Sequence, residues 1–181
     1  MSVVDQLTDS GLGLDYDELR LLTTTEAWIA AGATLRDRME EVLGDAAAAV
    51  EQIGSTSVAW MLAKPIVDLA VGLAPEQDLE RARSRLEGEG WIYRGDAGAD
   101  GGYRFVLEDR PWHRVAHAHV VPLGGDQWRD YLRLRDLLRA SPSARQQYSM
   151  VKRRLLEVSG NDRSAYTTGK SDVVRGLIGS E

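Results

Sequence analysis

Apolar and polar positions alternate along this chain in patterns that predict both helices and strands. One long helix is predicted before Gly44 by apolar residues that recur every three or four positions: Trp28, Ala31, Leu35, Met39, Val42 and Leu43. Thr23 and Glu26 have the spacing of a capping box, which predicts that Thr23 caps this helix, although a start near Asp17 also fits.

Five segments have the composition of strands. Residues 65–73 are almost wholly apolar, as expected for a strand covered on both faces, and only Asp68 interrupts them. Further strands are predicted at 48–53, 91–94, 103–108 and 114–123, and further helices after Pro75 and at 126–140, 142–158 and 168–178. This order predicts an α/β (α+β) fold, with a mixed sheet of about five strands flanked by helices and a helical C-terminal part.

The chain has the length of one domain. Residues 1–15 carry no periodic pattern, so we expect a mobile or loosely packed segment there, followed by a single domain over 16–181. Apolar residues make up 43% and charged residues 28% of the chain, and no apolar run approaches the roughly 20 residues that span a bilayer. With no cysteine and no signal-peptide pattern at the start, a cytoplasmic protein without disulfides or thiolate metal sites is expected.

Charge is unevenly distributed. The net charge of −6 argues against general nucleic-acid binding. The segment from Arg129 to Arg154, however, contains eight basic residues and only two acidic ones, both aspartates. A solvated helical face with paired charges is the favoured interpretation. The alternative is a basic wall beside an anionic ligand such as a triphosphate.

A small polar run, Gly54-Ser55-Thr56-Ser57, follows the strand predicted at 48–53. A turn of this kind exposes backbone N–H groups that bind phosphate, and the Ser55 hydroxyl adds a donor. The same residues also make ordinary turns, which composition alone favours.

Asp68 is the most informative residue, because an ionised carboxylate within an apolar strand needs a compensating partner. Two interpretations stay open: an ion pair with Lys64 or Arg104, or a Mg²⁺ ligand that positions a triphosphate.

His117 and His119 lie two residues apart in a predicted strand and therefore project from the same face. Such a pair can bind a metal or act as acid and base, and Arg104 on the neighbouring predicted strand can hold a phosphate. Tyr148 and Lys152 share a helix face, for which a solvated lysine over a packed tyrosine is the default interpretation. Arg135 and Asp136 are read in the same way as a surface ion pair.

Together these segments resemble the GrpB family from about Tyr16 onward. The resemblance is carried by residues 51–58 (EQIGSTSV) and 63–69 (AKPIVDL) and is supported by 117–120 (HAHV), 134–139 (LRDLLR), Tyr148 with Lys152, and Tyr166 with Lys170. It implies a nucleotidyltransferase-like fold, in which Gly54-Ser55 is the phosphate-binding turn and Asp68 a metal ligand. The expected phosphate-binding residues are Gly54, Ser55, Thr56, Ser57, Lys64, Arg104, Arg135, Lys152 and Lys170. The expected catalytic residues are Asp68, His117 and His119, with Asp68 and His119 as ligands of Mg²⁺.

The chain also departs from the expected pattern. Active nucleotidyltransferases carry two acidic residues separated by one, whereas Ile66 and Ala70 flank Asp68 at that spacing. The family usually has histidine where Gln52 stands and a glycine-containing turn where Trp60 stands.

The leading hypothesis is a Mg²⁺-dependent enzyme that transfers the nucleoside monophosphate group of a triphosphate to a small acceptor. One alternative is a non-catalytic module that binds a nucleotide or a coenzyme A-like ligand. The other is a ligase-like or tailoring enzyme for a small carboxylic acid, in which Arg104 and the two histidines matter more than Asp68.

Overall fold

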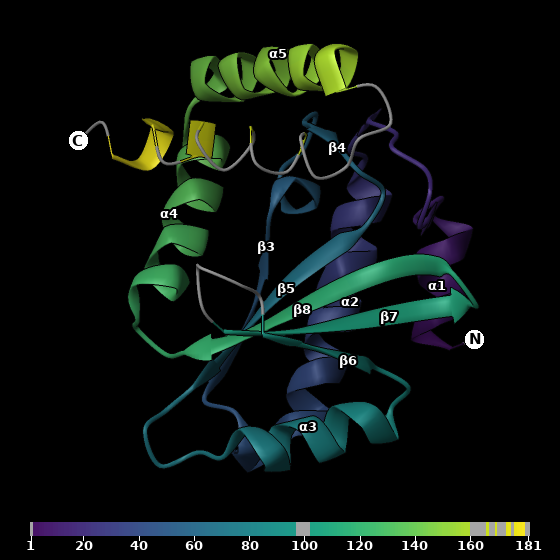
Figure 1. Cartoon of the computed structure of the whole chain (residues 1–181), viewed down its shortest axis with the longest axis vertical. Helices are drawn as coiled ribbons and strands as arrows, with labels where there is room; N and C mark the ends of the chain where they lie inside the picture. Colours follow the sequence, from purple (N-terminus) through teal and green to yellow (C-terminus); the bar gives the residue numbers. More distant parts are fainter. Residues whose placement is uncertain are drawn as a thin grey trace.

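The computed structural model describes residues 2–96, 102–159, 166, 169, 173–174 and 176–179. Helices and strands alternate in the first part of the chain, and helices follow the sheet (Figure 1). The helices are α1 (Val3–Asp9), α2 (Glu26–Leu43), α3 (Leu79–Gly88), α4 (Asp126–Ala140) and α5 (Pro142–Ser159), with short 3₁₀ turns at Gly44–Ala46 and Ser55–Ser57. The strands are β1 (Leu14–Asp15), β2 (Leu22–Thr23), β3 (Ala49–Ile53), β4 (Leu62–Ala63), β5 (Val67–Leu73), β6 (Ile92–Asp96), β7 (Tyr103–Arg110) and β8 (His113–Pro122).

The main sheet is mixed, as the sequence predicts. Its order is β3-β5-β8-β7-β6, and β1 pairs with the start of β8 as a sixth strand. Only β5 and β8 run parallel; the other neighbouring strands are antiparallel. The five predicted strands are all present. The short strand β1 and the separate β2–β4 pair were not predicted, because two-residue strands leave no periodic pattern.

The two faces of the sheet have different roles. One face carries Val67, Leu69 and Val71 from β5 and Ala116, Ala118 and Val120 from β8, which form the main core with α1, α2 and α3. In Figure 1, α2 lies behind the sheet and α3 lies along one edge of it. The other face carries the alternate residues of the same strands, and α4 covers one end of it through Trp128, which packs on Ile53, Ala70 and Val121. Helix α5 packs against α4.

The N-terminal segment differs from the expectation of loose packing. Residues Val3–Asp9 form α1, which Ser2 caps through a reciprocal bond with Asp5. Leu7, Leu12 and Leu14 are buried, and the indole N–H of Trp28 donates to the Ser10 carbonyl at 2.9 Å. The segment is part of the main core, so the predicted boundary near residue 16 is wrong. A seven-residue helix owes its stability to these tertiary contacts and not to its own sequence pattern.

Two predicted helix starts also shift. The cap of α2 is Thr25, whose hydroxyl accepts from the Trp28 amide at 3.2 Å, while Thr23 lies in β2. Thr24 is buried between them. Its hydroxyl donates to the Val58 carbonyl and accepts from the Met61 amide, so this stretch is held to the loop after the Gly54 turn. Helix α3 begins at Leu79, because Asp78 and not Pro75 caps it.

Of the helix predicted at 168–178, residues 168, 170–172 and 175 lie outside the described residues, whereas 169, 173–174 and 176–178 are helical. Among the helices that the structure describes, none is both long enough and apolar enough to cross a membrane.

Replacing Leu7 by alanine tests whether α1 belongs to the core. Since the side chain is fully buried, Leu7→Ala should lower the free energy of unfolding by about 2–5 kcal/mol in urea titrations. Leu22→Ala is the matched control, because Leu22 is 38% exposed and should lose far less stability. Equal, small effects of the two substitutions would mean that α1 is not packed as described.

Candidate functional site

Asp68, His117 and His119 converge on the sheet face that α4 partly covers. The parallel register places Asp68 opposite His117 and Ala70 opposite His119, so the three side chains project from one face. The Oδ1 atom of Asp68 lies 3.2 Å from Nδ1 of His117 and 3.6 Å from Nε2 of His119. These histidines therefore contact the Asp68 carboxylate. Among the described residues neither Lys64 nor Arg104 pairs with this carboxylate, so the suggested pairing is wrong.

The electrostatics of the cluster favour an anionic aspartate. Burial alone would raise the pKa of Asp68, but the contacts with His117 and His119 outweigh burial and bring the pKa well below its usual range. Burial lowers the pKa of His117 despite the opposing effect of Asp68, which favours a neutral ring. At neutral pH the cluster thus offers a charged carboxylate beside a neutral imidazole, the protonation states in which both groups bind cations.

The predicted Gly54 turn lies directly against this carboxylate. Gly54 has φ +70°, a left-handed conformation that favours glycine, and a Cβ atom there would lie 2.8 Å from Oδ2 of Asp68. Ser55–Ser57 then form a single 3₁₀ turn, in which the Ser57 hydroxyl donates to the Gly54 carbonyl at 2.7 Å. The turn and the carboxylate, which are separate motifs in the sequence, form one site.

The C-terminal helices hold the turn in place. The Arg139 guanidinium donates to the Ser57 carbonyl at 3.1 and 3.2 Å. The Lys152 ammonium donates to the Ser55 hydroxyl and to the Leu62 carbonyl. Lys152 is only 2% exposed and lies 4.3 Å from the centre of the Tyr148 ring, so the expectation of a solvated lysine at this position is wrong.

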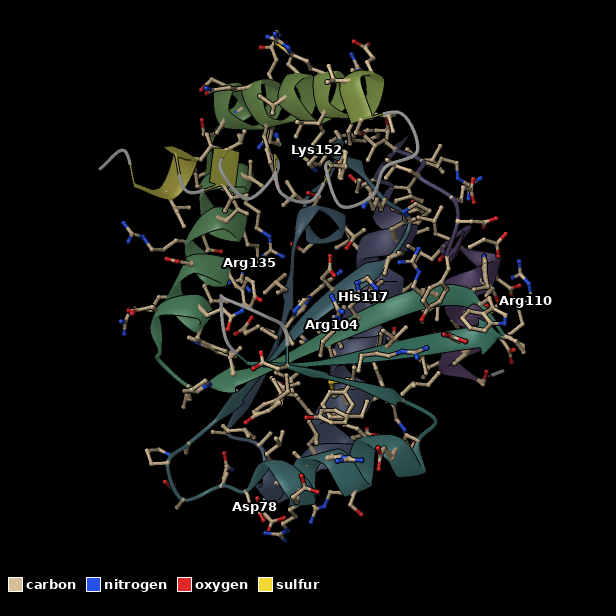
Figure 2. The ribbon with its side chains drawn as sticks, in the orientation of Figure 1. Asp78, Arg104, Arg110, His117, Arg135 and Lys152 are labelled. Carbon is tan, nitrogen blue, oxygen red and sulfur yellow. The ribbon has the colours of Figure 1, made fainter. Side chains whose placement is uncertain are left out.

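Arg135 approaches the same region from α4. It forms the predicted pair with Asp136 at 2.8 Å, but it also contacts Glu51 on β3 at 2.6 Å and donates to the Gln52 carbonyl at 3.3 Å. Its side chain is only 11% exposed, so it is no plain surface pair. In Figure 2, Arg135 and Lys152 extend from α4 and α5 toward the side of the sheet on which His117 lies.

The other predicted phosphate-binding residues are less closely grouped. Arg104 is exposed on β7, directly opposite His119, and within the described part of the chain it forms no ion pair (Figure 2). The Lys64 ammonium lies over the Tyr166 ring, 4.4 Å from its centre. Thr56 is buried in the turn. Lys170 lies outside the described residues.

The donor set does not match Mg²⁺, the expected metal. Mg²⁺ prefers oxygen ligands in octahedral geometry, whereas two of the three convergent donors are imidazole nitrogens. The positions where a second carboxylate would stand, Ile66 and Ala70, are buried and apolar.

Sequence reasoning missed Glu51 as a partner of Arg135 and Arg139 as a partner of the turn. Glu51 falls in the resembling segment but faces the site only because β3 pairs with β5. Arg139 lies four residues after Arg135, one helical turn further along the same face. That spacing was the available signal.

Comparisons with known proteins identify relatives over nearly the whole chain. A family model described as GrpB protein matches residues 18–179. Glutamate-rich protein GrpB of Alkalihalophilus pseudofirmus is 30% identical over 172 residues, which cover 92% of this chain and 98% of that protein.

Solved structures with the same fold include the conserved protein GrpB from Enterococcus faecalis. It superimposes with a TM-score of 0.74 at 23% identity, over 88% of this chain and 98% of that one. A chain of the GLD-2/RNP-8 complex matches 97% of this chain with a TM-score of 0.55 at 14% identity, and this chain covers 64% of it. At these identities the likeness concerns the fold alone, a mixed sheet flanked by helices.

Adding a methyl group at Gly54 tests the contact between the turn and Asp68. Alanine is strained at both Gly54 and Gly90, which have positive φ, and the strain is larger at Gly54, where ψ is −174° and the conformation is almost confined to glycine. Only Gly54→Ala also collides with Asp68, because the space around Gly90 is open. Gly54→Ala should therefore lose more stability than Gly90→Ala and shift the imidazole NMR signals of His117 and His119. Identical losses with unmoved histidine signals would contradict the contact.

Proposed function

This chain belongs to the GrpB family, and we propose that it has the nucleotidyltransferase-like fold implied by that resemblance and is a nucleotide-using enzyme that transfers a nucleoside monophosphate group to a small acceptor. In this proposal the triphosphate binds at the Gly54–Ser57 turn. Asp68, His117 and His119 form the reacting centre beside it.

The observation that carries this proposal is the contact between Gly54 and the Asp68 carboxylate. A phosphate-binding turn has to lie beside a group that would hold the cation offsetting the phosphate charge, and an ionised carboxylate such as Asp68 can hold one. Positioning and charge stabilisation provide most of the catalysis in phosphoryl-group transfer. A Cβ atom at Gly54 would lie 2.8 Å from Oδ2 of Asp68, so only glycine fits at this position beside the carboxylate.

Positive charge around the turn supports an anionic substrate. Arg135, Arg139 and Lys152 all reach the turn or the strand that leads into it. Arg139 and Lys152 donate to uncharged groups and bring positive charge to the turn, whereas Glu51 and Asp136 offset the charge of Arg135. Arg104 is exposed on the same sheet face and can bind a phosphate directly.

The reaction itself is a substitution at the α-phosphorus. The hydroxyl oxygen of the acceptor forms a bond to that phosphorus, and the bond to the oxygen that bridges to the β-phosphate breaks. Pyrophosphate leaves with the electron pair, and the hydroxyl proton passes to solvent water. The residues at the turn hold the triphosphate in place.

A binding module without catalysis is the second candidate, and the single strand carboxylate favours it. With apolar residues at positions 66 and 70, the site lacks the second acid of active nucleotidyltransferases. A nucleotide or a coenzyme A-like ligand would then bind at the same turn without reacting. The third candidate, an enzyme for small carboxylic acids, has only the proximity of Arg104 to His119 in its favour.

Ligand-induced stabilisation of wild-type protein and Asp68→Asn tests the assignment. Wild-type protein should show a higher melting temperature with a nucleoside triphosphate and a divalent cation, because a ligand that binds only the folded state stabilises it. Turnover to pyrophosphate should be lost in folded Asp68→Asn. The panel contains ATP, GTP, CTP, UTP, coenzyme A and small carboxylic acids.

Asp109→Asn is the matched control, since Asp109 also pairs with a histidine, His113, but lies outside the site. It should retain the ligand response. Unchanged turnover in Asp68→Asn would refute the role of Asp68. Stabilisation by nucleotides without any product would favour the binding module, and stabilisation by coenzyme A or a carboxylic acid alone would overturn the nucleotidyltransferase assignment.

A further inference from the structure

We propose that Asp68, His117 and His119 together bind one borderline transition-metal ion, of the class of Zn²⁺ and Co²⁺, in preference to Mg²⁺. The inference rests on these three side chains and does not require the nucleotide proposal. It assigns both histidines as metal ligands and replaces Mg²⁺, the metal expected from the sequence, by a transition-metal ion.

The spacing of the donor atoms suits a small cation. One donor atom from each side chain can be chosen so that all lie within 4.8 Å of one another. In tetrahedral coordination with metal–ligand distances of about 2.1 Å, neighbouring donors are about 3.4 Å apart. Oδ1 of Asp68 lies 3.2 Å from Nδ1 of His117 and 3.6 Å from Nε2 of His119, on either side of that value.

The chemical type of the donors selects the metal. Two imidazoles and one carboxylate are a typical set for catalytic zinc and for non-haem iron, which keep open positions for water or substrate. Mg²⁺ instead dehydrates reluctantly and is held by carboxylates and phosphate oxygens. No second acid stands beside Asp68 on β5, so an all-oxygen site cannot form from this strand.

The site is held firmly yet remains accessible. All three ligands come from β5 and β8, adjacent strands in the middle of the sheet. The hydrogen bonds between the strands therefore fix the backbone at each ligand. The side chains are 28% exposed for Asp68 and 21% for each histidine, which permits an ion to enter and leaves room for further ligands.

Within the described part of the chain, one of the two histidine ligands has no hydrogen-bond partner to orient its ring, and this limits the expected affinity for the metal ion. When His119 binds an ion through Nε2, its proton lies on Nδ1, which is buried without a hydrogen-bond partner among the described residues. Outer-shell partners of this kind contribute 10- to 100-fold to metal affinity. We therefore expect an exchangeable ion that chelators remove, and not a permanent structural metal.

The position of the turn gives the ion a role. Because Gly54 lies against the other oxygen of Asp68, an anion held by the turn would be a neighbour of the bound ion. This last step rests on the proposed function, whereas the binding of the ion itself does not.

Metal titration of tag-free protein tests the inference directly. After chelator treatment, wild-type protein should bind one equivalent of Zn²⁺ by calorimetry, and Co²⁺ should produce visible absorption bands of a site with nitrogen ligands. His117→Ala and His119→Ala should each weaken binding by on the order of 100-fold or more, beyond the effect of losing an outer-shell partner. A large excess of Mg²⁺ should not displace the ion.

His113→Ala is the matched control, because His113 is the remaining histidine of the chain and pairs with Asp109 away from the cluster. It should bind metal like wild-type protein. His119→Gln, which keeps a polar side chain, provides a second variant if His119→Ala fails to fold by circular dichroism.

Failure of wild-type protein to bind Zn²⁺ or Co²⁺, unchanged binding in the His117 and His119 variants, or displacement by Mg²⁺ would overturn the inference. The outcome is separable from that of the proposed function. If the protein binds the metal but nucleotides neither stabilise it nor react, only the proposed function is refuted. If nucleotides stabilise it but no transition metal binds, only this inference is refuted.

Discussion

The parallel pairing of β5 with β8 is the constraint on which the candidate site depends. Asp68 is the one charged residue within an otherwise apolar strand, and its burial has to be compensated. The register that pairs Asp68 with His117 provides this compensation and also brings His119 within 3.6 Å. A shift by one residue would turn either the aspartate or the histidines toward the opposite face and leave the carboxylate without a partner. The polar cluster and the strand register therefore specify each other.

The same two strands contribute to the main core and to the polar cluster at alternate positions. Leu69 and Ala118 face the main core, while Asp68 and His117 face the partly covered side. Because side chains alternate along a strand, the apolar core fixes the backbone of the polar cluster without contacting it. This arrangement holds the polar cluster on rigid elements.

Sequence patterns predicted those parts of the fold that are long and periodic, and they missed what depends on tertiary pairing. Strand β5 was predicted from its apolar run, and the shared face of His117 and His119 from their spacing. Their convergence with Asp68 was not predictable, because no local signal tells which strands become neighbours. The buried state of Lys152 was missed for a similar reason: its helical spacing to Tyr148 indicates one contact but not the Ser55 and Leu62 acceptors on another element. The N-terminal helix was missed because it is only seven residues long, with one fully buried side chain, Leu7, and two partly buried ones, Val3 and Val4.

The basic residues of α4 and α5 illustrate why a cluster of charge does not by itself identify a ligand site. Arg139 and Lys152 donate to the turn, and Arg135 pairs with Glu51, so their first role is to fix the loop that follows β3. A turn fixed in this way loses little conformational entropy when an anion binds, and its donors need not reorganise as charge develops. Arg104 differs, because it is exposed and forms no ion pair with any described residue. The fixed cations thus position the turn, while Arg104 lies exposed on the sheet face that carries His119.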